Sequence, residues 1–336
     1  MVKYLCMNEF LKSPEAKKSE PEVKFFFSAH GTPEDYRGIE QAFSEADIYV
    51  LESHAWKDGD LEELRSIASG DTVPTHISEG REPKDAIEYE EELLYKSGKR
   101  VEIVDVPMEH ELANEDDGSS KYNDIVDRFV AQGDLNSSVE SLQDTARQNA
   151  DYIKKKDDYV EKELKKLIDQ IADESPEAKI LVQMGSSHSG ISHKLRKEGV
   201  AKRVMNEVRY DFNDELLRTF RFNKEPNTEL ISRSLIEQTI KRFFFDEMIK
   251  VPYLLRNKFF RDTLSDISTE QVQQMGQIME SRYFDEMIMG GGDDTPETNR
   301  VIFVYAWEAV IGSDINLLIS QLEMQVSNDD KKEDDV

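Results

Sequence analysis

The chain has 336 residues, of which 38% are hydrophobic and 34% are charged, and its formal net charge is −27. Such an excess of acidic residues excludes non-specific binding to a nucleic-acid backbone, which depends on lysine and arginine. Its single cysteine, Cys6, excludes an internal disulfide and fits a reducing compartment. No stretch approaches the roughly 20 apolar residues of a membrane helix, and no secretory signal is evident, so we expect a cytoplasmic protein without a membrane partner.

The first two-thirds of the sequence alternates short apolar runs with longer amphipathic stretches. The apolar runs are too short for buried helices and predict buried strands at 24–29, 48–51, 101–106 and 180–184. An edge strand is predicted at 204–208. Helical spacing predicts helices at 33–45, 83–98, 138–172 and 192–198, and the polar stretch 113–124 is interpreted as a loop. Strands separated by helices indicate a mainly parallel sheet flanked by helices, which is an α/β fold.

The pattern changes at about residue 211, where apolar residues recur only at helical spacing. Helices are predicted at 214–220, 229–249, 269–287 and 298–325, with a linker at Gly290–Gly292. We therefore divide the chain into an α/β core domain at 1–210, an α-helical C-terminal region at 211–327 and a disordered acidic tail at 328–336.

Polar residues follow the predicted strands at the points where those strands end. His30 follows the first strand, Glu52 the second and His188 the fourth, and four of the six histidines fall within four residues of a strand end. Ligands of an open parallel sheet bind beyond the carboxyl ends of its strands. We therefore predict that His30, Glu52 and His188 mark an active-site edge, whereas the other histidines are interpreted as ordinary polar residues.

The residue types at this edge suit hydrolytic chemistry. Imidazole serves as a general base or as a metal ligand near neutral pH. A carboxylate such as Glu52 can orient an imidazole, deprotonate water or complete a metal site. The small residues around His188, such as Gly185 and Gly190, would let a substrate approach the backbone.

Two segments resemble the superfamily of TraB, Tiki, ChaN and the erythromycin esterases. They are SAHGTPEDYRGIEQAFSEADIYVLE and ILVQMGSSHSGISHKLRKEG, and the resemblance covers roughly residues 24–200. Members carry two GxxH motifs at strand ends, with a glutamate ending the strand between them. Gly185 to His188 match the second motif, Glu52 matches the glutamate, and His30 ends a first motif in which Phe27 replaces the glycine. The family's helical arginine has its nearest counterpart in Arg147.

The resemblance implies a hydrolase that acts on a peptide or an ester. His30 and His188 would flank the attacking water as bases or would bind a divalent metal ion together with Glu52. Glu52 would polarise or deprotonate the water, and Arg147 would stabilise the oxyanion. The alternative is a protein without catalysis that binds haem or a peptide in the same cleft, or that uses its helical region to bind another protein. The oligomeric state does not follow from the sequence.

Overall fold

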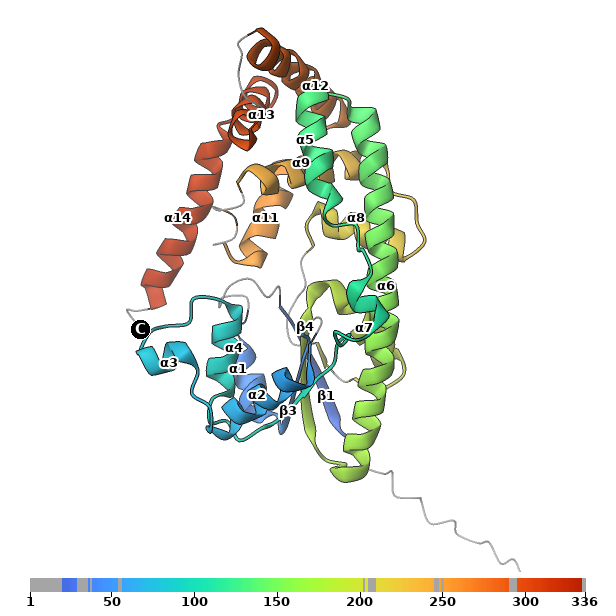
Figure 1. Ribbon diagram of the computed structural model, residues 1–336, viewed down its shortest axis with the longest axis vertical. Helices are drawn as coiled ribbons and strands as arrows, with labels where there is room; N and C mark the ends of the chain where they lie inside the picture. Colours follow the sequence, from blue (N-terminus) through green and yellow to red (C-terminus); the bar gives the residue numbers. More distant parts are fainter. Residues whose placement is uncertain are drawn as a thin grey trace, which may run out of the picture.

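The computed structural model describes residues 20–28, 36, 38–53, 56–201, 203–204, 210–244, 248, 251–289 and 295–333. A sheet with its covering helices occupies one end of the molecule, and a helical region occupies the other (Figure 1). The predicted α/β fold, with its parallel sheet and helical C-terminal region, is confirmed.

The sheet is parallel throughout and has the strand order β3-β2-β4-β1-β5. Its strands are β1 (Glu22–Ser28), β2 (Ile48–Leu51), β3 (Arg100–Ile103), β4 (Lys179–Gly185) and β5 (Arg203–Val204). The four main predicted strands are all present, but β3 ends three residues earlier than predicted. Of the edge strand predicted at 204–208, only Val204 belongs to β5, and 205–208 lie outside the described residues.

Seven α-helices lie in the described residues of this part of the chain, and most of them cover a face of the sheet. They are α1 (Ile39–Glu45), α2 (Asp58–Ser69), α3 (Thr75–Glu79), α4 (Ala86–Leu94), α5 (Lys121–Gln132), α6 (Leu135–Glu174) and α7 (Ser189–Lys197). Successive strand residues point to opposite faces, so Phe25 and Phe27 pack in a cluster with α6 and α7. Phe26 packs on the other face, in a cluster with α1, α2 and α4. The chain therefore buries a continuous aromatic strand on both sides, as in other parallel sheets.

The loop predicted at 113–124 ends earlier than expected, because α5 begins at Lys121. Two aspartates organise the turn before it: Asp116 accepts a hydrogen bond from the Gly118 N–H and Asp117 accepts one from the Ser119 N–H. Aspartate side chains readily accept hydrogen bonds from the backbone two residues ahead, and such bonds form a defined turn just before the helix.

The second part of the chain is helical, as predicted. Its helices are α8 (Phe212–Arg221), α9 (Thr228–Phe243), α11 (Tyr253–Leu264), α12 (Thr269–Tyr283), α13 (Pro296–Ile311) and α14 (Ile315–Glu333). The single helix predicted at 298–325 is divided into α13 and α14 at Gly312, whose φ of 76° ends α13 in a left-handed cap. Helix α14 includes 328–333, where disorder was predicted, and Gly290–Gly292 lie outside the described residues.

Within the described part of the chain, no single helix has the length and hydropathy needed to cross a membrane. Only α13 and the part of α14 up to Met324 meet that test together, and they are bent by 98° relative to each other.

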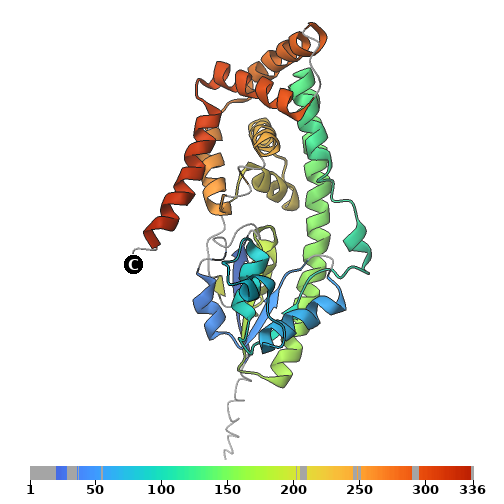
Figure 2. The same ribbon diagram turned by 60° about the vertical axis from the view of Figure 1, so that its left-hand side comes forward.

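Helix α6 connects the two parts of the molecule. Its 40 residues extend about 60 Å along one side of the structure (Figures 1 and 2). Leu142 and Ala146, near its start, are buried in the helical region, whereas Val160 and Leu164 are buried against the sheet. Helix α5 packs in the helical region as well, so this core contains residues that precede position 211.

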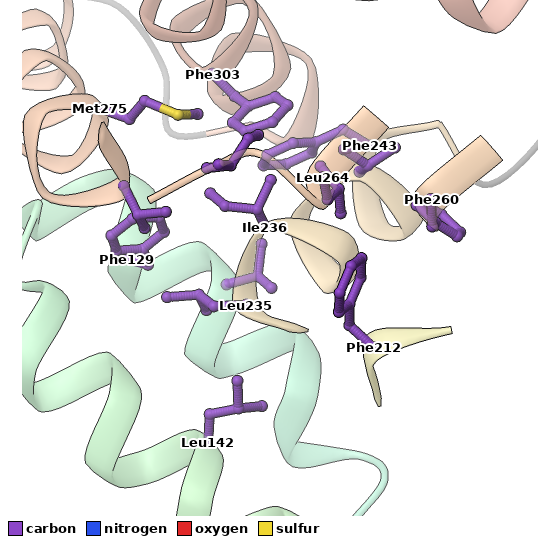
Figure 3. Packing of buried hydrophobic residues seen from close by; sticks show 14 of the residues in the cluster. Phe129, Leu142, Phe212, Leu235, Ile236, Phe243, Phe260, Leu264, Met275 and Phe303 are labelled. Atoms are coloured by element: carbon purple, nitrogen blue, oxygen red, sulfur yellow. The ribbon is translucent and has the colours of Figure 1, made fainter. Parts of the chain in front are cut away.

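The hydrophobic core of the helical region joins α5 and α6 to the helices that follow residue 211. Phe129 and Leu142 from the first group lie beside Leu235 and Ile236 of α9, with Phe303 of α13 above them (Figure 3). All five side chains are buried. The apolar area removed from water here attaches α8 and α9 firmly to α6.

Two glycines let α5 and α12 come into direct backbone contact. Gly133 ends α5 with φ 62°, and a Cβ on Gly276 of α12 would lie 2.5 Å from the Gly133 carbonyl oxygen. No side chain tolerates so short a contact with backbone, so the two helices can pack this closely only because both positions are glycine.

We predict that Gly276→Ala destabilises the protein by about 1–3 kcal/mol, because the added methyl group must push α12 away from α5. Urea denaturation followed by circular dichroism measures the change. Gly59→Ala is the matched control: an added Cβ there meets no atom within 4 Å, so stability should stay equal or rise slightly. Equal stability of both variants would contradict the proposed packing.

Candidate functional site

The carboxyl ends of β2 and β4 bring Glu52 and His188 together. The Glu52 N–H donates to the Gln183 carbonyl oxygen (3.1 Å), which extends the pairing of the two strands by one residue. The Glu52 carboxylate then accepts a hydrogen bond of 2.5 Å from the Gly185 N–H. The backbone of the neighbouring strand thus holds this carboxylate beside the turn that carries His188.

His188 is buried between two carboxylates. Its Nε2 lies 3.0 Å from Glu52 Oε1, and its Nδ1 lies 2.5 Å from Oδ1 of Asp157 on α6. The exposed fraction of the three side chains is 6% for His188, 11% for Glu52 and 6% for Asp157. A neutral imidazole has only one N–H, so it cannot donate to both carboxylates. The geometry therefore fits a doubly protonated imidazolium ion.

The electrostatics of the site agree with this protonation state. Burial by itself lowers the pKa of His188, but the adjacent carboxylates of Glu52 and Asp157 outweigh it and raise the pKa to about 9. At neutral pH the ring therefore carries a positive charge and holds two protons that it can donate.

Lys156, also on α6, lies between two carboxylates at the same edge. Its Nζ is 3.0 Å from Glu52 Oε1 and 3.2 Å from Oδ1 of Asp105, which follows β3. Burial lowers the pKa of Lys156, and the two carboxylates more than compensate, so the net change is upward. The pKa of Asp105 is raised, chiefly by its burial.

Arg221, at the end of α8, completes the cluster from the helical region. Its guanidinium pairs with Asp157 through Nη2 and donates through Nη1 to the Ser187 carbonyl oxygen at 2.5 Å. A Cβ at Gly190 would lie 3.1 Å from Arg221 Nη2 and 3.4 Å from Asp157 Oδ2. The small residue that we expected to admit a substrate thus gives room to the arginine.

We call this group the His188 cluster; it consists of Glu52, Asp105, Lys156, Asp157, His188 and Arg221. It contains three carboxylates and three cationic groups, so its formal charges cancel when His188 is protonated. Charges can be buried at tolerable cost only when each has a close partner of opposite sign. Removing one member would leave another buried and uncompensated.

The structure places only one of the other two predicted site residues, Arg147, and Arg147 does not join this cluster. His30 lies outside the described residues. Arg147 is 45% exposed, stacks on Phe220, and lies 3.5 Å from Asp144 and 3.6 Å from Glu225. It precedes Asp157 by ten residues of helix, which is about 15 Å along the axis of α6.

Lys156, Asp157, Asp105 and Arg221 were not identified from the sequence. A signal existed for the first two: they lie in the run KKKDD, yet they occupy the same face of α6 as the buried Tyr152, Val160 and Leu164. Charges at apolar positions of an amphipathic helix indicate a buried polar site. Asp105 was placed inside a predicted strand, and for Arg221 the sequence contains no comparable signal.

The predicted metal ligand His30 lies outside the described residues, so the metal site remains a prediction, but the space between Glu52 and Asp105 does not fit a divalent metal ion. The Lys156 ammonium already occupies the position between Glu52 and Asp105 that a cation would need. Among the residues that the structure describes, no group of three histidine, cysteine or acidic side chains is arranged to hold a metal.

A cavity of about 450 Å³ adjoins the cluster between α6, α7 and α8. Asp157 and Arg221 reach its wall, as do Phe27 at the end of β1 and Gly190 at the start of α7. The cavity is of the size that small-molecule ligands occupy.

No family model, curated protein or solved structure matches this chain. The resemblance to the TraB, Tiki, ChaN and erythromycin esterase superfamily therefore remains an expectation that rests on the two short motifs.

His188 should make the stability of the protein depend on pH. Its pKa is about 9 in the folded chain and 6.5 when unperturbed, so its contribution is complete below pH 6.5 and is lost as the pH rises through 9. The difference between these two pKa values corresponds to on the order of 3 kcal/mol of folding free energy. Urea denaturation between pH 6 and pH 10 should show this decline in the wild-type protein and a flatter profile in His188→Asn. An unchanged profile would contradict the ion pairing.

Lys156→Met should destabilise the fold by about 3–5 kcal/mol, because it leaves Glu52 and Asp105 buried without their shared cation. Adding Asp105→Asn should restore part of the loss, since one of the two carboxylates is then neutral. Lys155→Met is the matched control on the adjacent, exposed position of α6, with an expected cost below about 1 kcal/mol. Equal effects of the two lysine variants in urea denaturation would argue against the cluster.

Proposed function

We propose that the chain is a hydrolase that acts on an ester or a peptide at the carboxyl edge of the sheet. The observation that carries the proposal is the pairing of a buried imidazolium, His188, with a carboxylate, Glu52, at 3.0 Å. Such a pair supplies a proton donor and a proton acceptor side by side, which is what general acid–base hydrolysis requires.

In the proposed reaction, Glu52 removes a proton from the attacking water, and His188 donates its Nε2 proton to the leaving oxygen or nitrogen. One bond to the carbonyl carbon forms as the other breaks, and no net proton is consumed. Glu52 is then protonated and His188 neutral. Because the two atoms lie 3.0 Å apart, the proton can return directly from Glu52 to His188 and restore the starting state.

The remaining members of the cluster support these two groups. Lys156 places a positive charge 3.0 Å from Oε1 of Glu52, the residue that acts as the base. Asp157 orients the imidazole through Nδ1, and Arg221 holds Asp157 in place. No step is assigned to a metal ion, because Lys156 occupies the place between the carboxylates, and none is assigned to His30 or Arg147.

A second candidate function is ligand binding without catalysis. It is favoured by one observation: both ring nitrogens of His188 are already engaged by carboxylates, so a substrate must displace Glu52 from Nε2 before the proton can be transferred. A cluster that never opens would serve only to shape the adjoining cavity, which could then hold a ligand such as haem or a peptide.

The test is turnover of p-nitrophenyl esters and fluorogenic peptides by the wild-type protein and by His188→Asn and Glu52→Gln. Each variant should lose activity by about 10²-fold or more, because each lacks one proton-transfer group. The rate should also fall as the pH rises through about 9, where His188 loses its acidic proton. Chelation with EDTA should leave the rate unchanged.

His110→Asn is the control, since His110 also lies near a strand end but contacts Tyr159 and accepts a hydrogen bond from the Leu112 N–H. Full activity in His188→Asn would overturn the proposed mechanism. Absence of turnover on every substrate, together with ligand binding or a Soret band after haem addition, would favour the second candidate.

A further inference from the structure

The cavity beside the His188 cluster is lined by positively charged side chains, although the chain as a whole has a net charge of −27. We call it the α6–α7–α8 pocket. Its basic lining residues are Lys154, His193, Lys194, Arg196, Arg218 and Arg221. Among the described residues, its acidic lining residues are Asp157 and Asp158.

Both of these aspartates are already neutralised by partners within the protein. Asp157 pairs with Arg221 and with His188. Asp158 lies 3.0 Å from the Lys194 ammonium, which also pairs with Glu161 at 2.8 Å. These ion pairs use the charge of Lys194 and Arg221, so each described carboxylate of the pocket lining has a cationic partner.

Three of the other four basic groups, Lys154, Arg196 and Arg218, have no carboxylate partner among the described residues. Lys154 and Arg196 are exposed, and Arg218 is half-buried, with its guanidinium 3.8 Å from the centre of the Tyr210 ring. Positive charges gathered around one cavity raise the local concentration of anions. The pocket therefore has a positive excess that a negatively charged ligand would compensate.

Aromatic side chains form the rest of the recognition surface. Phe27, Tyr210 and Phe222 all line the pocket, and Phe222 is 61% exposed, which is unusual for so large an apolar side chain. A flat ring can stack on such surfaces, and a cation already stacked on tyrosine remains free to bind an anion through its edge.

The elements that carry these groups are held firmly. The Tyr210 hydroxyl is hydrogen-bonded to Ser189 Oγ at 2.6 Å. The backbone carbonyl oxygen of Tyr210 accepts a hydrogen bond of 2.7 Å from Arg261. Asp211 caps α8 by accepting from the Asp214 N–H. Tyr210 and the start of α8 are thus positioned before a ligand arrives, which reduces the entropy lost on binding.

We propose that the α6–α7–α8 pocket binds a small organic anion, a phosphate or carboxylate attached to an aromatic ring, through Lys154, Arg196 and Arg218. Taking this anion as the substrate rests on the proposed hydrolase function, because Asp157 and Arg221 belong to both the pocket and the His188 cluster. Binding of the anion itself does not require catalysis.

The experiment is isothermal titration calorimetry of the full chain with phenyl phosphate, benzoate and, as the uncharged analogue, benzamide. At least one anion should bind at least about tenfold more tightly than benzamide, and its affinity should fall with added sodium chloride. The triple variant Lys154→Gln, Arg196→Gln, Arg218→Gln should lose at least tenfold in that affinity. Comparing phenyl phosphate with benzoate shows which anionic group the pocket prefers.

Lys197→Gln is the matched control, because Lys197 lies beside Arg196 on α7 and does not line the pocket. It should bind the anions like the wild type, and circular dichroism should show that all variants are folded. Equal affinity for benzamide, absence of anion binding, or unchanged binding in the triple variant would overturn the proposal. The His188→Asn variant should still bind the anion, because His188 does not line the pocket. Anion binding therefore tests this proposal separately from the hydrolase proposal, and it is expected even if no substrate is turned over.

Discussion

Buried ion pairing between α6 and the carboxyl edge of the sheet is the interaction on which the rest of the structure depends. Lys156 and Asp157 are adjacent on α6, and they pair with opposite charges: the lysine with Glu52 and Asp105, the aspartate with His188. Hydrophobic contacts of Val160 and Leu164 bring α6 onto the sheet, but they would tolerate small shifts along the helix. Charge pairing at 2.5–3.2 Å does not tolerate them, so the cluster determines the register of the helix.

The same pairing determines what His188 can do. Between Glu52 and Asp157 the imidazole is a cation with a raised pKa, so near neutral pH it has a proton to donate and no free nitrogen to accept one. This reverses the role that histidine at a strand end usually suggests. In the proposed reaction the basic role therefore belongs to Glu52, whose carboxylate is held by the Gly185 N–H and by Lys156. The assignment of proton donor and proton acceptor in the proposed reaction follows from burial and charge, not from residue type.

Because of Arg221, the His188 cluster contains residues from both the sheet domain and the helical region. It comes from α8, which packs in the helical core with Leu142 of α6, yet its guanidinium reaches Asp157 and the turn before α7. A displacement of α8 would therefore change the charge balance around His188 and also move Arg218 and Tyr210 in the adjoining pocket. The helical region thus contributes to the site. Helix α6 connects this region to the sheet as a single continuous helix (Figure 2).

The local pattern of apolar and polar residues was sufficient to predict much of the fold. Apolar runs such as IYVL identified strands whose ends bear Glu52 and His188, and helical spacing identified the C-terminal region, because both signals depend only on neighbouring residues. The break at Gly312 and the helix at 253–264 were missed, since a left-handed cap and a weakly amphipathic helix leave little periodic signal. By itself the sequence determined the parallel α/β class and the edge where polar groups gather. Only the tertiary structure decided that Lys156, Asp157 and Arg221 join that edge, because their pairing links segments up to 104 residues apart and no local pattern encodes such contacts.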